Sequence, residues 1–324
     1  MNFVEPLAEL YEEKDLVKKI ERCYRMCYKS EDKIKEGSAQ FMNVLIHNDY
    51  KNKHWSPLEH ARVVVQVTDK IAFVVHDWQV KRHSAFIDVH AAILSDTSAV
   101  YYLTGNFRAF MDFIYDNKDS DVESSYAALQ INNSLAEEYP IIFNQFSSGE
   151  HNPAVSVISE ASDYKTFRVV TTRDILQELA RHRSLSFSVE STRYCNYSKR
   201  GMTFTIPRPY AWTDEFDWEI ANTYHYNQID YPNESVERFI VHCGCCEKAY
   251  NKAIADGWKP QEARMLLPGA LKSELYLTGT FPAWRHFLDL REDGDRPHPQ
   301  IRFLAKLIHE LLDKSSPNWK NSID

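Results

Sequence analysis

The chain of 324 residues is long enough for one large domain or for a domain with a substantial insertion. Hydrophobic residues make up 44% and aromatic residues 13% of the chain, which is ample for a core and argues against wholesale disorder. The net charge of -8 disfavours broad binding to a nucleic acid polymer, because such binding neutralises many phosphates, but it leaves nucleotides possible as ligands.

The sequence has none of the patterns that we would expect of a membrane or secreted protein. No run approaches the ~18 apolar residues that a membrane helix needs. Residues 1–10 contain no basic segment leading into an apolar one. Six cysteines in a chain of this length fit a reduced compartment better than a disulfide framework. We therefore expect a cytoplasmic protein with no membrane partner.

The N-terminal third is predicted to be helix followed by strand. Apolar residues recur at helical spacing over about 15–47. Ser56, Pro57 and Glu59 then form the pattern of a capping box, so we expect a short helix with Ser56 as its N-cap. The valine-rich segment 61–67 predicts a strand.

Residues 69–165 are predicted to have mixed structure. Strands are expected at 71–75 and 99–103, and a helix near 107–115. Polar loops are expected at 116–125 and 145–153.

A short internal echo links two distant parts of the chain. Segment 103–110 and segment 277–284 share five identities in eight positions. The echo is too short to prove duplication. It predicts that both segments form similar turns from a strand into a helix.

The second half begins with a strand at 167–170 and a capping-box pattern at 171–174. The helix that follows has an apolar stripe, and it brings Arg181 and Arg183 near its C-terminal end. Further elements are predicted in this order: extended chain at 202–207, an aromatic and acidic loop at 212–233, a helix at 235–255 stopping at Gly257, a strand at 275–278, and helices at 284–291 and 299–314.

Two patterns invite a metal site, and we favour the simpler interpretation of each. His76, His83 and His90 are seven residues apart, but the stretch reads better as strands and turns. Segment 242–246 holds a histidine and three cysteines inside a helical pattern, without a second ligand pair at zinc spacing. We expect buried or half-buried thiols there, as for Cys23 and Cys27, and no metal.

The strongest functional signal is a row of anion-binding residues. Arg181, His182 and Arg183 are followed after seven residues by Ser191, and then by Arg193 and Tyr194. Residues 173–200 include six basic and three acidic residues, although the chain as a whole carries a net negative charge. Arginine matches phosphate bidentately, and hydroxyls complete such a site. The alternative is a solvated basic helix end that complements the helix dipole.

This spacing resembles the signature of the flavin-dependent thymidylate synthases, and other motifs of that family follow the same order. His54, then segment 56–60, matches a family motif that leads into a strand. Segment 257–268 is similar to a motif with an arginine before an apolar pair and proline, here Arg264. The resemblance covers about 16–67 and 167–312. It implies one mixed α/β domain over 1–324, with a mostly antiparallel central sheet flanked by helices and an insertion at about 69–165.

The resemblance also implies the reaction and its ligands. The family methylates deoxyuridine monophosphate (dUMP) to thymidylate (dTMP), with methylenetetrahydrofolate as the carbon donor. FAD performs the reducing step and is itself reduced by NADPH. Family members are homotetramers whose active sites combine several subunits, so we expect a homotetramer. The expected partners are these small molecules.

Residue roles follow from the same resemblance. Arg291 is expected to stabilise charge that develops on the uracil ring, His54 to face the folate, and Ser191 to orient the nucleotide rather than act as a nucleophile; Cys195 is not expected to be catalytic. FAD is assigned to Ser56, Arg181, His182, Arg183 and His286. The nucleotide is assigned to Glu178, Arg181, Glu190, Ser191, Arg193, Tyr194, Arg264 and Arg291.

Some positions depart from the family pattern. Ser188 and Val189 replace an asparagine and an acidic residue or glutamine, and Thr280 replaces an asparagine near the flavin. Glu178 stands where glutamine is frequent, and its carboxylate would repel the substrate phosphate unless an arginine pairs with it. These departures keep two alternatives open: a methylase or hydroxymethylase of another pyrimidine nucleotide, and a non-catalytic nucleotide-binding homologue.

Overall fold

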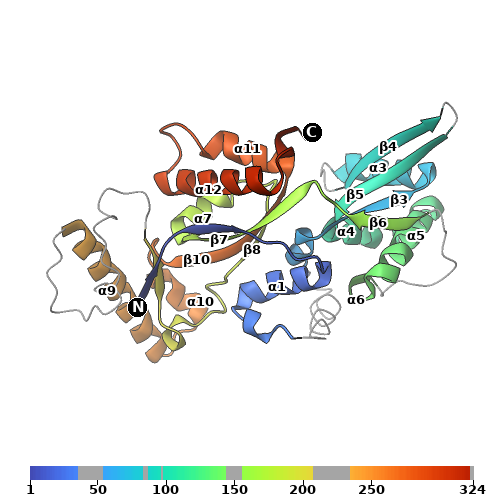
Figure 1. The fold of residues 1–324 in the computed structure, drawn as a ribbon. Helices are drawn as coiled ribbons and strands as arrows, with labels where there is room; N and C mark the ends of the chain where they lie inside the picture. Colours follow the sequence, from blue (N-terminus) through green and yellow to red (C-terminus); the bar gives the residue numbers. More distant parts are fainter. Residues whose placement is uncertain (36–53, 83–86, 96–97, 144–154, 207–233, 322–324) are drawn as a thin grey trace. The chain divides into compact units, whose positions relative to one another are not determined.

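The computed structural model describes residues 1–35, 54–82, 87–95, 98–143, 155–206 and 234–321. The chain divides into two compact units (Figure 1). The first unit comprises residues 1–12, 25–30 and 165–324, and the second comprises 13–24 and 31–164. Both units are built from antiparallel sheets and helices, which confirms the expected mixed α/β class.

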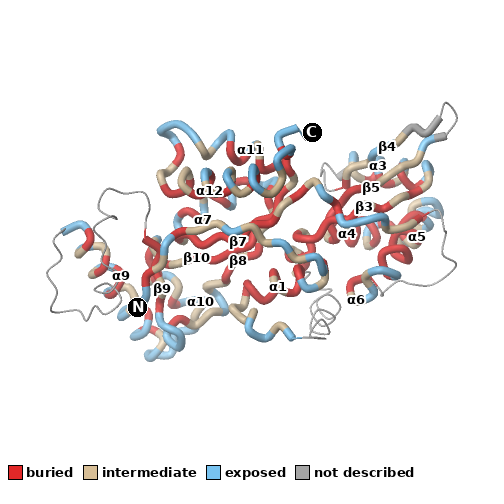
Figure 2. Tube along the Cα trace, viewed as in Figure 1, coloured by how far each residue is buried: buried red, intermediate tan, exposed pale blue. Residues whose placement is uncertain are grey.

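The first unit is centred on a four-stranded sheet in the order β2-β7-β10-β8. Strand β2 (Leu7–Leu10) pairs antiparallel with β7 (Tyr164–Thr172), and β10 (Lys272–Thr280) pairs antiparallel with β8 (Ser186–Val189). Figure 2 shows buried residues along the strands of this sheet. Three helices accompany the sheet: α7 (Arg173–Leu179), α11 (Phe281–Arg291) and α12 (Pro299–Ser315).

Helix α12 shows why the predicted C-terminal helix forms. Its apolar residues Ile301, Leu304, Ile308 and Leu312 recur every three or four positions and are fully buried. They join the core cluster that also holds Trp284 of α11. The apolar stripe therefore fixes how this helix covers the sheet.

A separate core cluster in the same unit surrounds the long helix α9 (Glu234–Ala255). Strands β1 (Asn2–Val4) and β9 (Thr203–Thr205) pair in parallel beside it. The chain then turns at Gly257, whose φ of 95° favours glycine. The remaining short elements are η3 (Tyr197–Lys199), α10 (Pro260–Ala263), η5 (Arg264–Leu266) and η6 (Trp319–Asn321).

The second unit holds a four-stranded antiparallel sheet in the order β4-β5-β3-β6. Its strands are β3 (Arg62–Val67), β4 (Ile87–Ser95), β5 (Ser98–Asn106) and β6 (Ser156–Glu160). Its helices are η1 (Glu31–Lys33), η2 (Ser56–His60), α3 (Asp69–Arg82), α4 (Phe107–Asn117), α5 (Val122–Glu138) and α6 (Pro140–Phe143). Helix α1 (Leu16–Tyr28) contributes residues to both units.

The internal echo marks two equivalent strand-to-helix turns, as predicted. Strand β5 runs into α4 and strand β10 runs into α11. At the junctions, the side chain of Asn106 accepts a hydrogen bond from the N–H of Ala109 at 2.8 Å, and Thr280 accepts from Ala283 at 3.4 Å. Each polar residue caps its helix from the same position of the repeated segment.

Four local predictions are wrong. Segment 71–75 lies in α3 and not in a strand. Its valines and isoleucine favour a strand, but the buried Ile71, Val75 and Trp78 follow helical spacing. The loop predicted up to residue 125 ends earlier, because Asp121 caps α5. Neither predicted capping box forms: Ser56 is the first residue of η2 rather than its N-cap, and Thr172 makes no side-chain capping bond.

The other predicted elements fall within described helices and strands, except for a few segments. The later part of 15–47, His83, and segments 145–153 and 212–233 lie outside the described residues, wholly or in part. Within the described ranges, no helix has the length and hydropathy needed to cross a bilayer.

Candidate functional site

The Arg-His-Arg motif lies in the turn that follows α7. The helix ends at Leu179, and the N–H groups of Arg181 and His182 donate to the carbonyls of Glu178 and Leu179. Arg181 and Arg183 are exposed, whereas His182 is only 5% exposed. The turn therefore presents two arginines to solvent and inserts the histidine between them into the protein.

His182 holds Arg291 at the end of α11. Arg291 Nε donates to His182 Nε2 at 2.9 Å, so the histidine accepts through Nε2 and carries its proton on Nδ1. Burial lowers the pKa of His182 to about 4, assisted by the positive charge of Arg291 and by His286. The imidazole is therefore neutral near pH 7 and remains an acceptor.

Arg291 also pairs with Glu178 from α7. Arg291 Nη1 lies 3.1 Å from Glu178 Oε2, and both side chains are partly exposed. The structure thus supplies the arginine that a carboxylate at this position requires. His286 lies nearby, its ring centroid 6.4 Å from that of His182. Four predicted site residues come together here: Glu178, His182, His286 and Arg291.

A cavity of about 250 Å³ gathers the second half of the signature. Its lining includes Glu190, Ser191, Arg193 and Arg264, all predicted to bind the nucleotide. Arg173 and Lys272 line it as well, so four cations surround the space with one carboxylate. We call this space the first cavity. Its charge suits an anionic group of a small ligand.

The loop around Ser191 is fixed by hydrogen bonds. The N–H of Ser191 donates to the carbonyl of Cys27 at 3.1 Å, and its Oγ accepts from the N–H of Arg193 at 3.3 Å. No base is hydrogen-bonded to this hydroxyl among the described residues, which agrees with an orienting role. Tyr194 is 57% exposed and lies beside Tyr28, with 5.1 Å between ring centroids.

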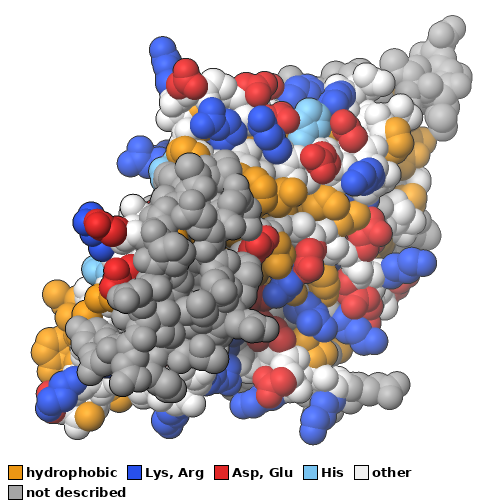
Figure 3. Space-filling view, turned by 60° about the vertical axis from the view of Figure 1, so that its left-hand side comes forward, with side chains coloured by type: hydrophobic (Ala, Val, Ile, Leu, Met, Phe, Trp, Pro, Cys, Tyr) orange, Lys and Arg blue, Asp and Glu red, His pale blue; other side chains and the backbone are white. Residues whose placement is uncertain are grey.

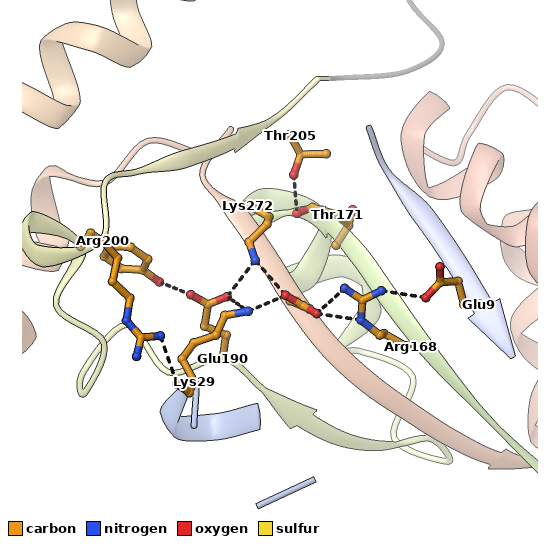
Figure 4. Close-up of polar contacts among 10 residues, drawn as sticks. Glu9, Lys29, Arg168, Thr171, Glu190, Arg200, Thr205 and Lys272 are labelled. Carbon is orange, nitrogen blue, oxygen red and sulfur yellow. Dashed lines mark hydrogen bonds and ion pairs between the residues drawn. The ribbon is translucent and has the colours of Figure 1, made fainter. Parts of the chain in front are cut away.

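Glu190 is a buried residue in the wall of the first cavity. Tyr197 donates its hydroxyl proton to Glu190 Oε1 at 3.1 Å. Lys29 Nζ lies 3.2 Å and Lys272 Nζ 3.5 Å from Glu190 Oε2 (Figure 4). The carboxylate is thus occupied by protein partners rather than directed at a ligand.

The ionic network continues through Glu274 on β10. Glu274 pairs with Lys29 and, at 2.8 Å, with Lys272, while Arg168 Nε donates to its other oxygen at 2.7 Å (Figure 4). Burial would raise the pKa of Glu274, but Lys272 and Lys29 outweigh burial and lower it to about 2. Burial would lower the pKa of Lys29, but the two glutamates raise it. Glu274 and Lys29 therefore remain charged near neutrality.

Lys29 reaches the network through an unusual backbone conformation. It is the one described residue other than glycine with a positive φ, at 52°. This conformation costs about 1 kcal/mol for a residue with a Cβ atom. It occurs at the C-terminal end of α1, where it turns the lysine toward two buried carboxylates.

Apart from Glu190, the residues of this network were not predicted from the sequence. Lys29 and Glu274 are 245 positions apart, so only the tertiary fold brings them together. One available signal was the pair Lys272 and Glu274, because alternate residues of a strand share a face. Arg173, whose Nη1 donates to the carbonyl of Leu267 at 2.9 Å, was not predicted as a site residue either.

The N-terminal motif lies in the second unit. Ser56 begins η2, and the carbonyl of His54 accepts a hydrogen bond from the Tyr24 hydroxyl. The imidazole of His54 meets the ring of Tyr24 edge-on, at 5.5 Å between centroids. The roles assigned to His54 and Ser56 remain predictions.

The histidines and cysteines of the metal alternatives lie in regular elements. His76 is in α3 and His90 in β4, both exposed. Cys23, Cys27 and Cys243 are buried, and Cys245 is exposed. In the described part of the chain, no three histidine, cysteine or carboxylate side chains are grouped as metal ligands.

The first unit thus combines an α/β scaffold with a cation-lined cavity whose charge suits a small anionic ligand. A family model described as "Thymidylate synthase complementing protein" matches residues 9–90 and 156–318. The chain therefore belongs to this family, which confirms the resemblance to the flavin-dependent thymidylate synthases. Residues 91–155 lie between the matched segments.

Individual relatives agree with the family. The chain is 30% identical over 171 residues to a "Probable flavin-dependent thymidylate synthase" of Mycobacterium phage D29, covering 52% of this chain and 67% of the relative. It is 33% identical over 142 residues to the "Flavin-dependent thymidylate synthase" of Wolinella succinogenes, covering 44% and 62%. Among solved structures, the UMP/dUMP methylase PolB from Streptomyces cacaoi shares 17% identity and a TM-score of 0.41, covering 99% of this chain and 96% of that one.

Proposed function

We propose that this protein is a flavin-dependent thymidylate synthase that converts dUMP to dTMP with methylenetetrahydrofolate as the carbon donor and NADPH as the source of electrons. The observation that carries the proposal is the first cavity, which brings Ser191, Arg193 and Arg264 of two family motifs around one cation-lined space. The volume of about 250 Å³ suits a mononucleotide better than a dinucleotide.

In the proposed complex, Arg193 and Arg264 bind the phosphate of dUMP. Guanidinium groups match phosphate oxygens bidentately, and the Ser191 hydroxyl completes the hydrogen bonds. Arg173 and Lys272 add positive charge around the same space. Lys272 is held by Glu190 and Glu274, so we expect it to position the wall rather than to move onto the ligand.

The residues after α7 fit the anionic part of FAD. Arg181 and Arg183 are both exposed in a tight turn, where their guanidinium groups can donate to a pyrophosphate. When bound, FAD supplies the electrons that reduce the transferred carbon to a methyl group. His182 has a structural role here, because its neutral imidazole accepts a hydrogen bond from Arg291 and holds that side chain in place.

Arg291 is the proposed electrostatic catalyst. Two partners fix its guanidinium: Glu178 at Nη1 and His182 at Nε. For C5 to attack the electrophilic one-carbon unit, enolate-like negative charge must develop on the uracil ring and its oxygen. A preorganised cation against that oxygen stabilises the charge as it develops.

A related activity is the second candidate, and Glu178 is the observation that favours it. A carboxylate accepts hydrogen bonds but donates none, whereas the glutamine frequent in the family does both. The substrate could therefore be another pyrimidine nucleotide, and the product a methyl or hydroxymethyl derivative. A non-catalytic homologue would bind the nucleotide without turnover.

The absorption spectrum of the purified protein tests these possibilities. We would reconstitute the protein with FAD, remove oxygen, and add NADPH with and without dUMP. We expect bound flavin that bleaches, and bleaches faster with dUMP, and mass spectrometry should then identify dTMP. Another product would support the second candidate. Failure to retain flavin under any condition would contradict the synthase proposal and favour the non-catalytic homologue.

We also propose a homotetramer, as the resemblance implies, and a cytoplasmic location, as expected from the sequence patterns. On the face drawn in Figure 3, basic and acidic side chains of the described residues are interspersed, which fits small-molecule partners better than a nucleic acid polymer. Light scattering of the purified protein tests the assembly, and a monomer would contradict it.

A further inference from the structure

A second cavity lies on the other side of the wall formed by Glu190, Tyr197 and Lys272. These three residues line both the first cavity and a space of about 380 Å³. The second cavity is also lined by Tyr28, Tyr194, Lys199 and Arg200. Of its lining residues, Glu190 and Tyr194 were assigned to the nucleotide from the resemblance, whereas Lys199 and Arg200 have no assigned role.

The shared wall is electrically balanced and held from several sides. Lys29 and Lys272 face the buried carboxylates Glu190 and Glu274. The two lysines and two glutamates therefore cancel in charge. Because each carboxylate has at least two partners, the wall has little freedom to rearrange when one cavity is filled.

The other cations of the second cavity are not balanced in this way. Lys199 and Arg200 are exposed, and within the described ranges neither forms an ion pair. Arg200 Nη1 donates to the carbonyl of Lys29 at 3.0 Å (Figure 4). This bond orients the guanidinium at the cavity and leaves its other N–H groups for a ligand. The cavity thus carries a local excess of two positive charges.

The same cavity offers aromatic surface. Tyr28 and Tyr194 lie with 5.1 Å between ring centroids and 40° between planes, and Tyr194 is 57% exposed. Next to Arg200, Gly201 has nothing within 4 Å of the position that a Cβ would take. A flat ring could therefore lie against a tyrosine while its anionic group meets the two cations.

We propose that the second cavity binds an aromatic ring that carries a carboxylate or phosphate group. Both co-substrates of the proposed reaction contain such a group: the folate has an aminobenzoyl-glutamate part, and NADPH has an adenosine with a 2′-phosphate. Only this choice of source rests on the proposed function. The binding chemistry itself rests on the cavity.

Calorimetric titration of the full-length protein tests the proposal with two probes. One is para-aminobenzoyl-glutamate, an aromatic dicarboxylate, and the other is adenosine 2′,5′-bisphosphate, an aromatic bisphosphate. We expect at least one to bind, and glutamate and neutral para-aminobenzamide to bind about tenfold more weakly or not at all. The probe that binds identifies the source. If neither binds, the proposal is overturned.

Single substitutions test whether the probe binds in the second cavity. Lys199→Gln should weaken binding of the probe by about tenfold, because one charge-assisted contact is lost. Arg200→Gln should do the same. Lys306→Gln, an exposed lysine of α12 that lines neither cavity, is the matched control and should leave affinity unchanged. Equal effects of the control and Lys199→Gln would refute the assignment to the second cavity.

Competition with dUMP separates this proposal from the proposed function. If the two cavities are distinct sites, saturating dUMP should leave probe binding within about threefold. Displacement of the probe by dUMP would place it in the first cavity and overturn the inference. If dUMP itself does not bind, the proposed function fails, while probe binding that depends on Lys199 still supports the second cavity.

Discussion

Glu178 of α7 and Arg291 of α11 form an ion pair, with 3.1 Å between Oε2 and Nη1. Glu178 stands at a position where the family often has glutamine, and its partner Arg291 is the proposed electrostatic catalyst. A carboxylate there repels a dianionic phosphate, and the arginine compensates for this repulsion. Under the proposed function, we therefore expect the pair to couple dUMP affinity to the orientation of Arg291.

Replacing this carboxylate should separate the two effects. In Glu178→Gln, we expect dUMP to bind about three- to tenfold more tightly, because a negative charge leaves the site. Turnover should fall, because the neutral amide oxygen that replaces the carboxylate is a weaker acceptor and holds Arg291 less firmly, although the bond to His182 remains. Titration and steady-state kinetics measure the two quantities. Glu310→Gln, an exposed change on α12, is the control. Weaker nucleotide binding in Glu178→Gln would contradict the argument.

Removing the cation itself should act on the transition state. We expect Arg291→Ala to lower kcat by about 10²- to 10³-fold, the usual cost of a lost electrostatic stabiliser. The dissociation constant of dUMP should change much less. Arg291→Lys keeps the charge but loses the planar fork, so it should recover only part of the rate. The role is wrong if Arg291→Ala changes nucleotide affinity alone.

The parts of this fold that sequence could predict are those with one clear apolar stripe. Helix α12 buries a single face, and the predicted limits 299–314 lie within one residue of Pro299–Ser315. Helix α3 was missed because it exposes Phe73, which is 73% accessible, beside the buried Ile71 and Val75. Apolar residues on both faces conceal the helical period.

The residues of the candidate site also fall into two groups, those that the sequence could predict and those that it could not. Family motifs predicted Ser191, Arg193 and Arg264, and the fold gathers them around one cavity. Lys29 and Lys272 could not be assigned, because their carboxylate partners depend on the pairing of β10 with β8 and on the end of α1. Periodicity carries no information about such long-range pairs.

The buried network should stabilise the first unit measurably. Lys29→Met leaves Glu190 and Glu274 with fewer compensating charges, and breaking a buried ion pair from one side costs about 3 kcal/mol. We expect a loss of this order in the free energy of unfolding in urea. Lys33→Met, an exposed change in η1, should cost much less. Equal stability of the two variants would mean that the network contributes nothing net.

The neutral state of His182 should make stability depend on pH. Its pKa is lowered to about 4 by burial and by Arg291, whereas an unfolded histidine titrates near 6.5. Between these values the unfolded chain binds the proton and the folded chain does not. Stability therefore falls as the pH drops from about 6.5 to about 4, by at most about 1.4 kcal/mol per pH unit from this residue.

Comparison with a variant that cannot titrate isolates this contribution. His182→Gln can still accept a hydrogen bond from Arg291 through its amide oxygen but binds no proton in this range. The difference in unfolding free energy between the parent and His182→Gln should therefore narrow or change sign as the pH falls from 6.5 to 4. Urea titrations at several pH values measure it. A difference that stays constant would show that folding does not lower the pKa of His182, so the histidine would be protonated below about pH 6.5 and could not accept a hydrogen bond from Arg291 there.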